Sequence, residues 1–318
     1  MKLILGIKHR PIWPSYNRPL TDNEMNAINK ELLEYADLME HSGYDSSLIQ
    51  TEYKTDDFYN ILHLVGQKYR LSFELYFKYN KKELDQFKAF VFDATAAIAM
   101  KNDITYWSNY KDLNESEKYV NPNAKYPVKF NAKCGVRGTI KWKASKFIIA
   151  SQSSICVPKD IQEKIIQSDL TGYHLEQIIN MTKDTLEDAY CLTATKLMPD
   201  RIIDKLHIET DNELRREGNI IYPKGVLENI SDFNFTAEST SRDNGYAELV
   251  VSQKMRQFYL DNKIKGGHFE PVFELGTNMF EEYNKTIIDL AIDLQRYNEN
   301  HVIGHENIDP SILVNGVL

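Results

Sequence analysis

The chain is poor in cysteine and has no long apolar run. Its three cysteines, Cys134, Cys156 and Cys191, lie far apart, and no CxxC pair occurs. A sparse, odd set is typical of reduced thiols in the cytosol. The apolar run at Leu3–Ile7 is shorter than the core of a secretory signal, and no stretch approaches the roughly 18 apolar residues of a membrane span. We therefore expect a cytoplasmic protein that does not enter a membrane.

The sequence also lacks the short motifs of several enzyme classes and any excess of positive charge. No Walker A, G-x-S-x-G, G-x-G-x-x-G or His-Glu-x-x-His motif is present. With 46 acidic against 38 basic residues, the formal net charge is -8. This balance argues against direct binding of nucleic acid or of anionic membranes. We expect a protein that is not an enzyme and has no cofactor.

Clear strand and helix patterns are present in the first hundred residues. Apolar and polar residues alternate strictly from Tyr69 to Tyr79, which predicts a strand with one buried face. A capping-box pattern at Thr21–Glu24 and apolar residues at helical spacing up to Met39 predict a helix that ends at Gly43. The same reasoning predicts a short capped helix at 80–83 and a strand at 90–92.

The polar, Tyr- and Asn-rich stretch from Lys101 to Lys129 interrupts these patterns and predicts a long loop. A length of 318 residues suits one large domain or two small ones. We place the boundary in this loop, with an N-terminal α+β region at 1–130 and a second region at 131–318. The apolar spacing over 278–297 predicts a C-terminal helix.

The second region contains a weak internal repeat. Residues 155–178 align with residues 249–272 over 24 positions without a gap, with four identities and a better match of apolar positions. The pattern predicts a strand–helix–strand unit used twice, in copies near 147–180 and 246–275, with Gly172 and Gly266 at positive φ after the helices. We expect an α+β fold with mixed sheets and packed helices, its C-terminal half built from this duplicated unit.

Each copy carries a His-x-Glu pair, His174 with Glu176 and His268 with Glu270. Residues i and i+2 of a strand point to the same face, so each pair can bind a metal ion or act as an acid and a base. The simpler interpretation places the pairs on the water-exposed face of a half-buried strand. We prefer this interpretation and expect no metal.

Residues 131–178 and 246–275 resemble the immunity proteins of bacterial polymorphic toxin systems, especially the group named for a double CxxCG motif. The resemblance rests on a segment that runs strand, Val-Ser, amphipathic helix, Gly, aromatic-Glu-Pro-Val and stands here at residues 249–272. Where the motif has its first cysteine the chain has Asn131, followed by Cys134-Gly135, and no second CxxCG occurs. A structural zinc ion needs four ligands, so we expect no zinc knuckle.

The resemblance implies a protein that binds and neutralises a cognate protein toxin by forming a stoichiometric complex. A net charge of -8 would steer a basic toxin towards it. Tight binding needs desolvated aromatic anchors, and the Tyr-rich loop supplies candidates for the partner-binding face: Tyr106, Trp107, Tyr110, Tyr119 and Tyr126. The alternative is a hydrolase of unknown substrate that uses the repeated His-x-Glu pairs.

Overall fold

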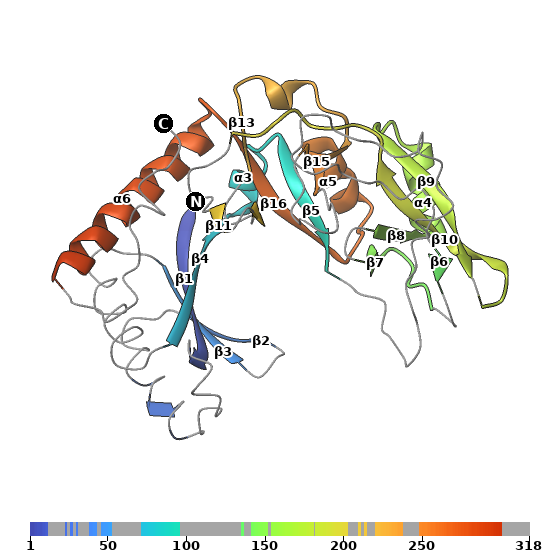
Figure 1. Ribbon diagram of the computed structural model, residues 1–318. Helices are drawn as coiled ribbons and strands as arrows, with labels where there is room; N and C mark the ends of the chain where they lie inside the picture. Colours follow the sequence, from blue (N-terminus) through green and yellow to red (C-terminus); the bar gives the residue numbers. More distant parts are fainter. Residues whose placement is uncertain are drawn as a thin grey trace. The chain divides into compact units, whose positions relative to one another are not determined.

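The fold is α+β, as the sequence predicts, with helices and mixed sheets in two compact units (Figure 1). The first unit comprises residues 1–84 and 281–318, and the second comprises residues 85–280. The computed structural model describes residues 1–11, 23, 26–27, 30, 38–42, 46–52, 71–95, 135–136, 141–151, 154–180, 182–202, 209–210, 213–214, 220–237 and 248–300. The boundary expected near residue 130 lies outside the described residues and stays a prediction.

The first unit contains an antiparallel sheet in the order β2-β3-β1-β4. Its strands are β1 (Lys2–Pro11), β2 (Leu38–Ser42), β3 (Ser46–Glu52) and β4 (Leu71–Lys78). β4 confirms the strand predicted from strict alternation. The helix expected to end at Gly43 is wrong at its C-terminal end, because residues 38–42 form β2. Pairing with β3 satisfies their backbone hydrogen bonds, which local apolar spacing does not reveal.

The helices α3 (Lys81–Leu84) and α6 (Asn278–Asn300) lie wholly or mostly in the first unit. The helix α3 begins with the predicted cap, in which Glu83 N donates to Asn80 Oδ1 at 3.0 Å and Asn80 N donates to Glu83 Oε2 at 2.7 Å. The predicted C-terminal helix is α6, and its buried Tyr283 packs on Phe77 of β4 with ring centroids 5.1 Å apart. Of the helices in the described residues, none has the length and apolar content needed to cross a membrane.

The second unit contains two five-stranded sheets with matching strand orders, β6-β9-β10-β8-β7 and β13-β16-β5-β15-β14. In each sheet the first pair is parallel and the other pairs are antiparallel. The strands of the first sheet are β6 (Gly135–Val136), β7 (Ile148–Ser151), β8 (Ser154–Pro158), β9 (Tyr173–Asn180) and β10 (Thr185–Ala194). Those of the second are β5 (Ala89–Ala94), β13 (Ile221–Tyr222), β14 (Phe233–Phe235), β15 (Leu249–Ser252) and β16 (Gly267–Glu274). A small separate pair joins β11 (Glu209–Thr210) to β12 (Glu213–Leu214).

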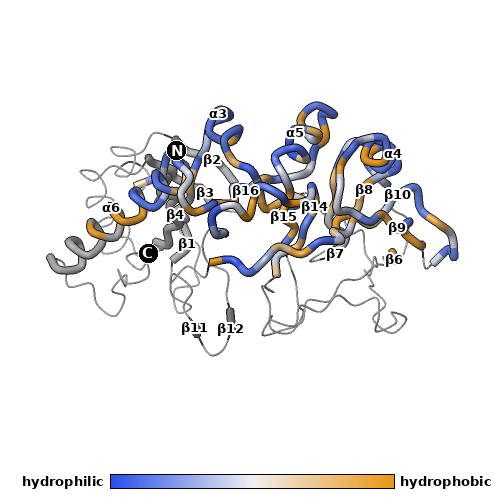
Figure 2. The backbone as a smooth tube through the Cα atoms, turned by 90° about the horizontal axis from the view of Figure 1, so that it is seen from above, coloured by the Kyte–Doolittle hydropathy of each residue, from blue (hydrophilic) through white to orange (hydrophobic). Residues whose placement is uncertain are grey.

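One helix follows the same strand position in each sheet. The helix α4 (Lys159–Gln167) connects β8 to β9, and α5 (Gln253–Asp261) connects β15 to β16; both lie on the same side in Figure 2. Ser252 caps α5 by accepting a hydrogen bond from Met255 N at 3.1 Å. Gly172 and Gly266 follow the helices with φ of +82° and +77°, as predicted. The two halves correspond in topology; that a segment was duplicated to produce them stays a prediction.

The central strand of the second sheet comes from the part of the sequence that we assigned to the N-terminal region. β5 pairs with β15 on one side and with β16 on the other. Both of its faces are largely buried, and its sequence is accordingly a short apolar run rather than an alternation of apolar and polar residues. Only this long-range pairing places residues 89–94 in the second unit.

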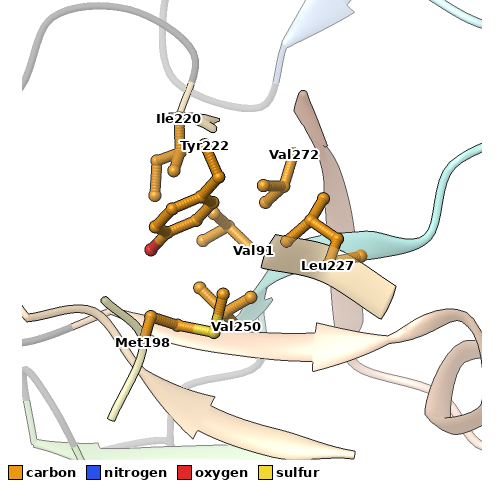
Figure 3. Packing of buried hydrophobic residues seen from close by; sticks show 8 residues of the cluster. Val91, Met198, Ile220, Tyr222, Leu227, Val250 and Val272 are labelled. Carbon is orange, nitrogen blue, oxygen red and sulfur yellow. The ribbon is translucent and has the colours of Figure 1, made fainter. Parts of the chain in front are cut away.

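The core of the second sheet has a different filling on each face. One face is covered by the segment around the 3-10 helix Val226–Glu228. Figure 3 shows the side chains that pack together on this face: Val91, Met198, Ile220, Tyr222, Leu227, Val250 and Val272. The other face, under α5, is aromatic: the ring of Phe92 lies 5.0 Å from those of Phe147 and Phe269.

Candidate partner-binding surface

The five aromatic residues that the sequence analysis proposed for a partner-binding face lie outside the described residues. Tyr106, Trp107, Tyr110, Tyr119 and Tyr126 therefore stay a prediction.

The His-x-Glu pairs lie on the faces of their strands that point away from the helices. Phe269 packs on Tyr259 of α5 with ring centroids 5.0 Å apart, so its neighbours His268 and Glu270 point to the opposite side. His174 Nε2 lies 3.3 Å from Glu176 Oε2, and their side chains are 51% and 38% exposed.

The side chains of both pairs are partly or fully exposed to water. A hydrogen bond in water gains far less for catalysis than one in a dry, preorganised site. His268 stands opposite Asp93 of β5, and both side chains are exposed. Among the described residues there is no group of three or more His, Cys, Asp or Glu side chains that could hold a metal ion.

The buried acidic groups of this unit serve its structure. Asp232 accepts hydrogen bonds from Ser252 Oγ at 2.5 Å, Thr171 N at 2.8 Å and Thr171 Oγ1 at 3.1 Å. Glu274 accepts from Lys88 Nζ at 2.6 Å and from Gly225 N at 2.7 Å. Both carboxylates tie separate segments together, which accounts for their burial.

The carboxylate of Glu274 is also held in its charged form. Burial alone would raise the pKa of Glu274, but the hydrogen bonds from Lys88 and from the backbone N–H groups of Leu227 and Gly225 outweigh it and lower the pKa. The pairing with Lys88 raises the pKa of that ammonium group in turn. The ionised carboxylate of Glu274, through its hydrogen bonds to Gly225 N and Leu227 N, holds the loop at residues 225–228 in place.

The turns after α4 and α5 pack on each other's half of the unit. Phe233 N donates to Thr171 O at 3.1 Å, and Phe147 N donates to Lys265 O at 2.9 Å. These contacts are reciprocal, since Thr171 and Lys265 stand immediately before the two positive-φ glycines. The two sheets are therefore held in one body by equivalent hydrogen bonds on each side.

An apolar pair is left exposed on the β9–β10 hairpin. Ile179 and Leu186 are direct cross-strand partners and point to the same face. The two residues are 41% and 62% exposed, although the rest of this sheet has a well-buried apolar core. The hairpin is the yellow-green β9–β10 pair at the right of Figure 1.

The hairpin turn is held by local hydrogen bonds. Asn180 Oδ1 accepts from Thr182 N and from Lys183 N, both at 3.1 Å, and Asp184 takes the left-handed conformation with φ of +52°. A turn satisfied in this way presents Leu186 on a fixed backbone rather than on a free loop. Exposed apolar side chains on a well-held backbone lower the ordering cost of binding a partner.

Sequence patterns give little sign of this exposed pair. The internal alignment ended at residue 178 and placed no weight on Ile179, whose counterpart is Phe273 at the same offset. Leu186 stands alone in the polar stretch 182–188 and shows no periodicity. The signal that was present is a single large apolar residue among charged ones, just after a turn.

Comparison with known proteins adds no assignment. No family model, no curated protein and no solved structure matches the chain.

Proposed function

We propose that the protein is an immunity protein that neutralises a cognate bacterial toxin in the cytoplasm by forming a stoichiometric complex. The observation that carries the proposal is the exposed cross-strand pair Ile179 and Leu186, on β9 and β10 beside a turn held by hydrogen bonds. A partner that covers this pair gains apolar burial and orders little extra backbone, so the entropy cost of binding is low.

Two further features support binding rather than catalysis. The segment whose pattern resembles immunity proteins, residues 249–272, folds as β15, α5 and the greater part of β16. The net charge of -8 favours fast association with a basic partner. The Tyr-rich stretch at 101–129 remains a predicted second part of the binding face.

The test is co-expression with the product of the neighbouring gene, because immunity genes sit directly after their toxin genes. We expect the wild-type protein to restore growth and to co-purify with that product at equal stoichiometry. Leu186→Asp places a charge where the partner must exclude water, which costs about 2 kcal/mol or roughly 30-fold in Kd.

The matched control is Ile166→Asp on α4, because Ile166 is also a single exposed apolar residue, at 57%. It should neutralise like the wild type. If the neighbouring product is not toxic, or stays toxic with this protein in molar excess and no complex forms, the immunity proposal is wrong.

A hydrolase is the second candidate, and the observation that favours it is the 3.3 Å contact between His174 and Glu176. The same co-expression separates the two proposals. A double variant, His174→Ala with His268→Ala, should neutralise fully if the protein acts by binding. Loss of neutralisation with an intact complex would favour the hydrolase.

A further inference from the structure

The strands of the two sheets of the second unit can be matched to each other. The match identifies the residue of the second sheet that corresponds to the exposed Ile179, and what covers it. Ala89 pairs with Ser252, and Ala189 pairs with Pro158; Ser252 and Pro158 each stand directly before a helix. Thr95 N donates to Gly266 O at 2.9 Å, and Thr195 N donates to Gly172 O at 2.8 Å. β5 therefore corresponds to β10 at an offset of 100 residues, and β16 to β9 at an offset of 94.

In the second sheet the counterpart of Ile179 is covered by an aromatic ring from the chain itself. That counterpart is Phe273, which is fully buried. Phe87 packs on Phe273 with ring centroids 5.4 Å apart and on Phe90 at 6.2 Å, edge to face in both cases. The ring of Phe87 therefore closes this end of the sheet on the face that α5 covers.

In the first sheet the same place is left open. The register between β9 and β10 shifts between Leu186 and Tyr190, so no residue of this hairpin matches Phe87 by the offset alone, and the side chain of Glu187 in the shifted segment is engaged elsewhere. Its carboxylate accepts from Trp142 Nε1 at 2.8 Å and from Asn180 Nδ2 at 2.6 Å. Ile179 and Leu186 consequently stay exposed next to the half-buried ring of Tyr190, the counterpart of Phe90.

The covered sheet also carries a cation that the open sheet does not provide at the matching position. The guanidinium carbon of Arg256 lies 5.2 Å from the centroid of the Phe90 ring, and Arg256 Nη1 donates to Asp85 Oδ1 at 3.0 Å. The matching position on α4 is Gln162, which is neutral. Beside the open site, Asp184 and Asp188 flank Leu186 in the chain and are exposed.

We infer that the open site on Ile179, Leu186 and Tyr190 takes an aromatic side chain, accompanied by a lysine or arginine, from a protein partner. The partner thereby supplies what Phe87 and Arg256 supply in the other sheet. The exposed carboxylates of Asp184 and Asp188 complement the partner's positive charge. This inference rests on the proposed function, since it names the chemistry by which the toxin would be recognised.

The test uses short peptides and the full chain with labelled isoleucine and leucine methyl groups, observed by NMR. The probes are acetyl-Lys-Phe-Lys-amide, acetyl-Lys-Ala-Lys-amide and acetyl-Glu-Phe-Glu-amide. We expect the first peptide to shift the methyl signals of Ile179 and Leu186 in a saturable way, about fivefold more tightly than the acidic peptide. The alanine peptide should leave these signals unchanged.

Ile166 and Leu260 are internal controls, because they are exposed apolar residues on α4 and α5. The inference is wrong if their methyl signals move as much as those of Ile179 and Leu186. It is also wrong if acetyl-Lys-Phe-Lys-amide moves none of the four signals. A Leu186→Asp chain should lose the Ile179 shift.

The outcome is separable from that of the co-expression test. Selective peptide binding without neutralisation would keep the aromatic site and remove the immunity proposal. Neutralisation that survives Leu186→Asp, together with no selective peptide shift, would keep the immunity proposal and remove this site.

Discussion

Replacing Gly266 by alanine tests how tightly the turn after α5 is packed. Gly266 has a φ of +77°, and a Cβ added there would lie 2.5 Å from Phe147 O and 2.9 Å from Lys146 Cγ. The positive φ costs an alanine about 1 kcal/mol. The contact with backbone adds about 1–3 kcal/mol because the main chain at Phe147, directly before β7, must shift.

Gly225 is the matched control, because it also has a positive φ, +86°, and an added Cβ there would meet nothing within 4 Å. Gly225→Ala should therefore lower the free energy of unfolding by about 1 kcal/mol, and Gly266→Ala by about 2–4 kcal/mol. The measurement is urea unfolding followed by circular dichroism. Equal losses for the two variants would refute the packing argument.

Gly172→Ala extends the test to the other half. A Cβ on Gly172 would lie 2.5 Å from Phe233 O and 2.5 Å from Ser231 Cβ. If the two turns are equivalent, this variant should lose about as much stability as Gly266→Ala, within about 1 kcal/mol. A loss as small as that of Gly225→Ala would contradict the equivalence.

Two further changes test the buried acidic groups. Ser252→Ala removes the cap on Met255 N and a donor to Asp232, so the free energy of unfolding should fall by about 2–3 kcal/mol in urea titrations; a loss below about 0.5 kcal/mol would contradict that double role. In Glu274→Gln the thermal midpoint should fall less steeply than in the wild type as the pH is lowered. A variant whose midpoint falls as steeply as that of the wild type would contradict the pairing with Lys88.

The sign of the second effect follows from the lowered pKa of Glu274. A carboxyl group with a lower pKa in the folded state stabilises the fold above its unfolded pKa of about 4.3. That stabilisation is lost as the pH falls from there through the lowered folded value. Glutamine does not titrate, so Glu274→Gln removes this contribution at every pH.

Local patterns predicted the elements that depend on neighbours in sequence. The alternation at 69–79, the cap at Asn80 and the two glycines after the helices each involve a few adjacent residues, and the structure confirms β4, α3 and both positive φ values. The end of the helix predicted up to Gly43 was wrong because strand pairing with β3, which is not local, overrode the helical spacing.

The composition and the local pattern of the chain were enough to predict its α+β class and the helices α4, α5 and α6. Tertiary structure alone decided that β5 joins β15 and β16, that Phe87 covers Phe273, and that Ile179 stays exposed. The physical reason is that exposure depends on what packs above a side chain. In this protein Phe87 covers Phe273, which stands 186 positions later in the chain.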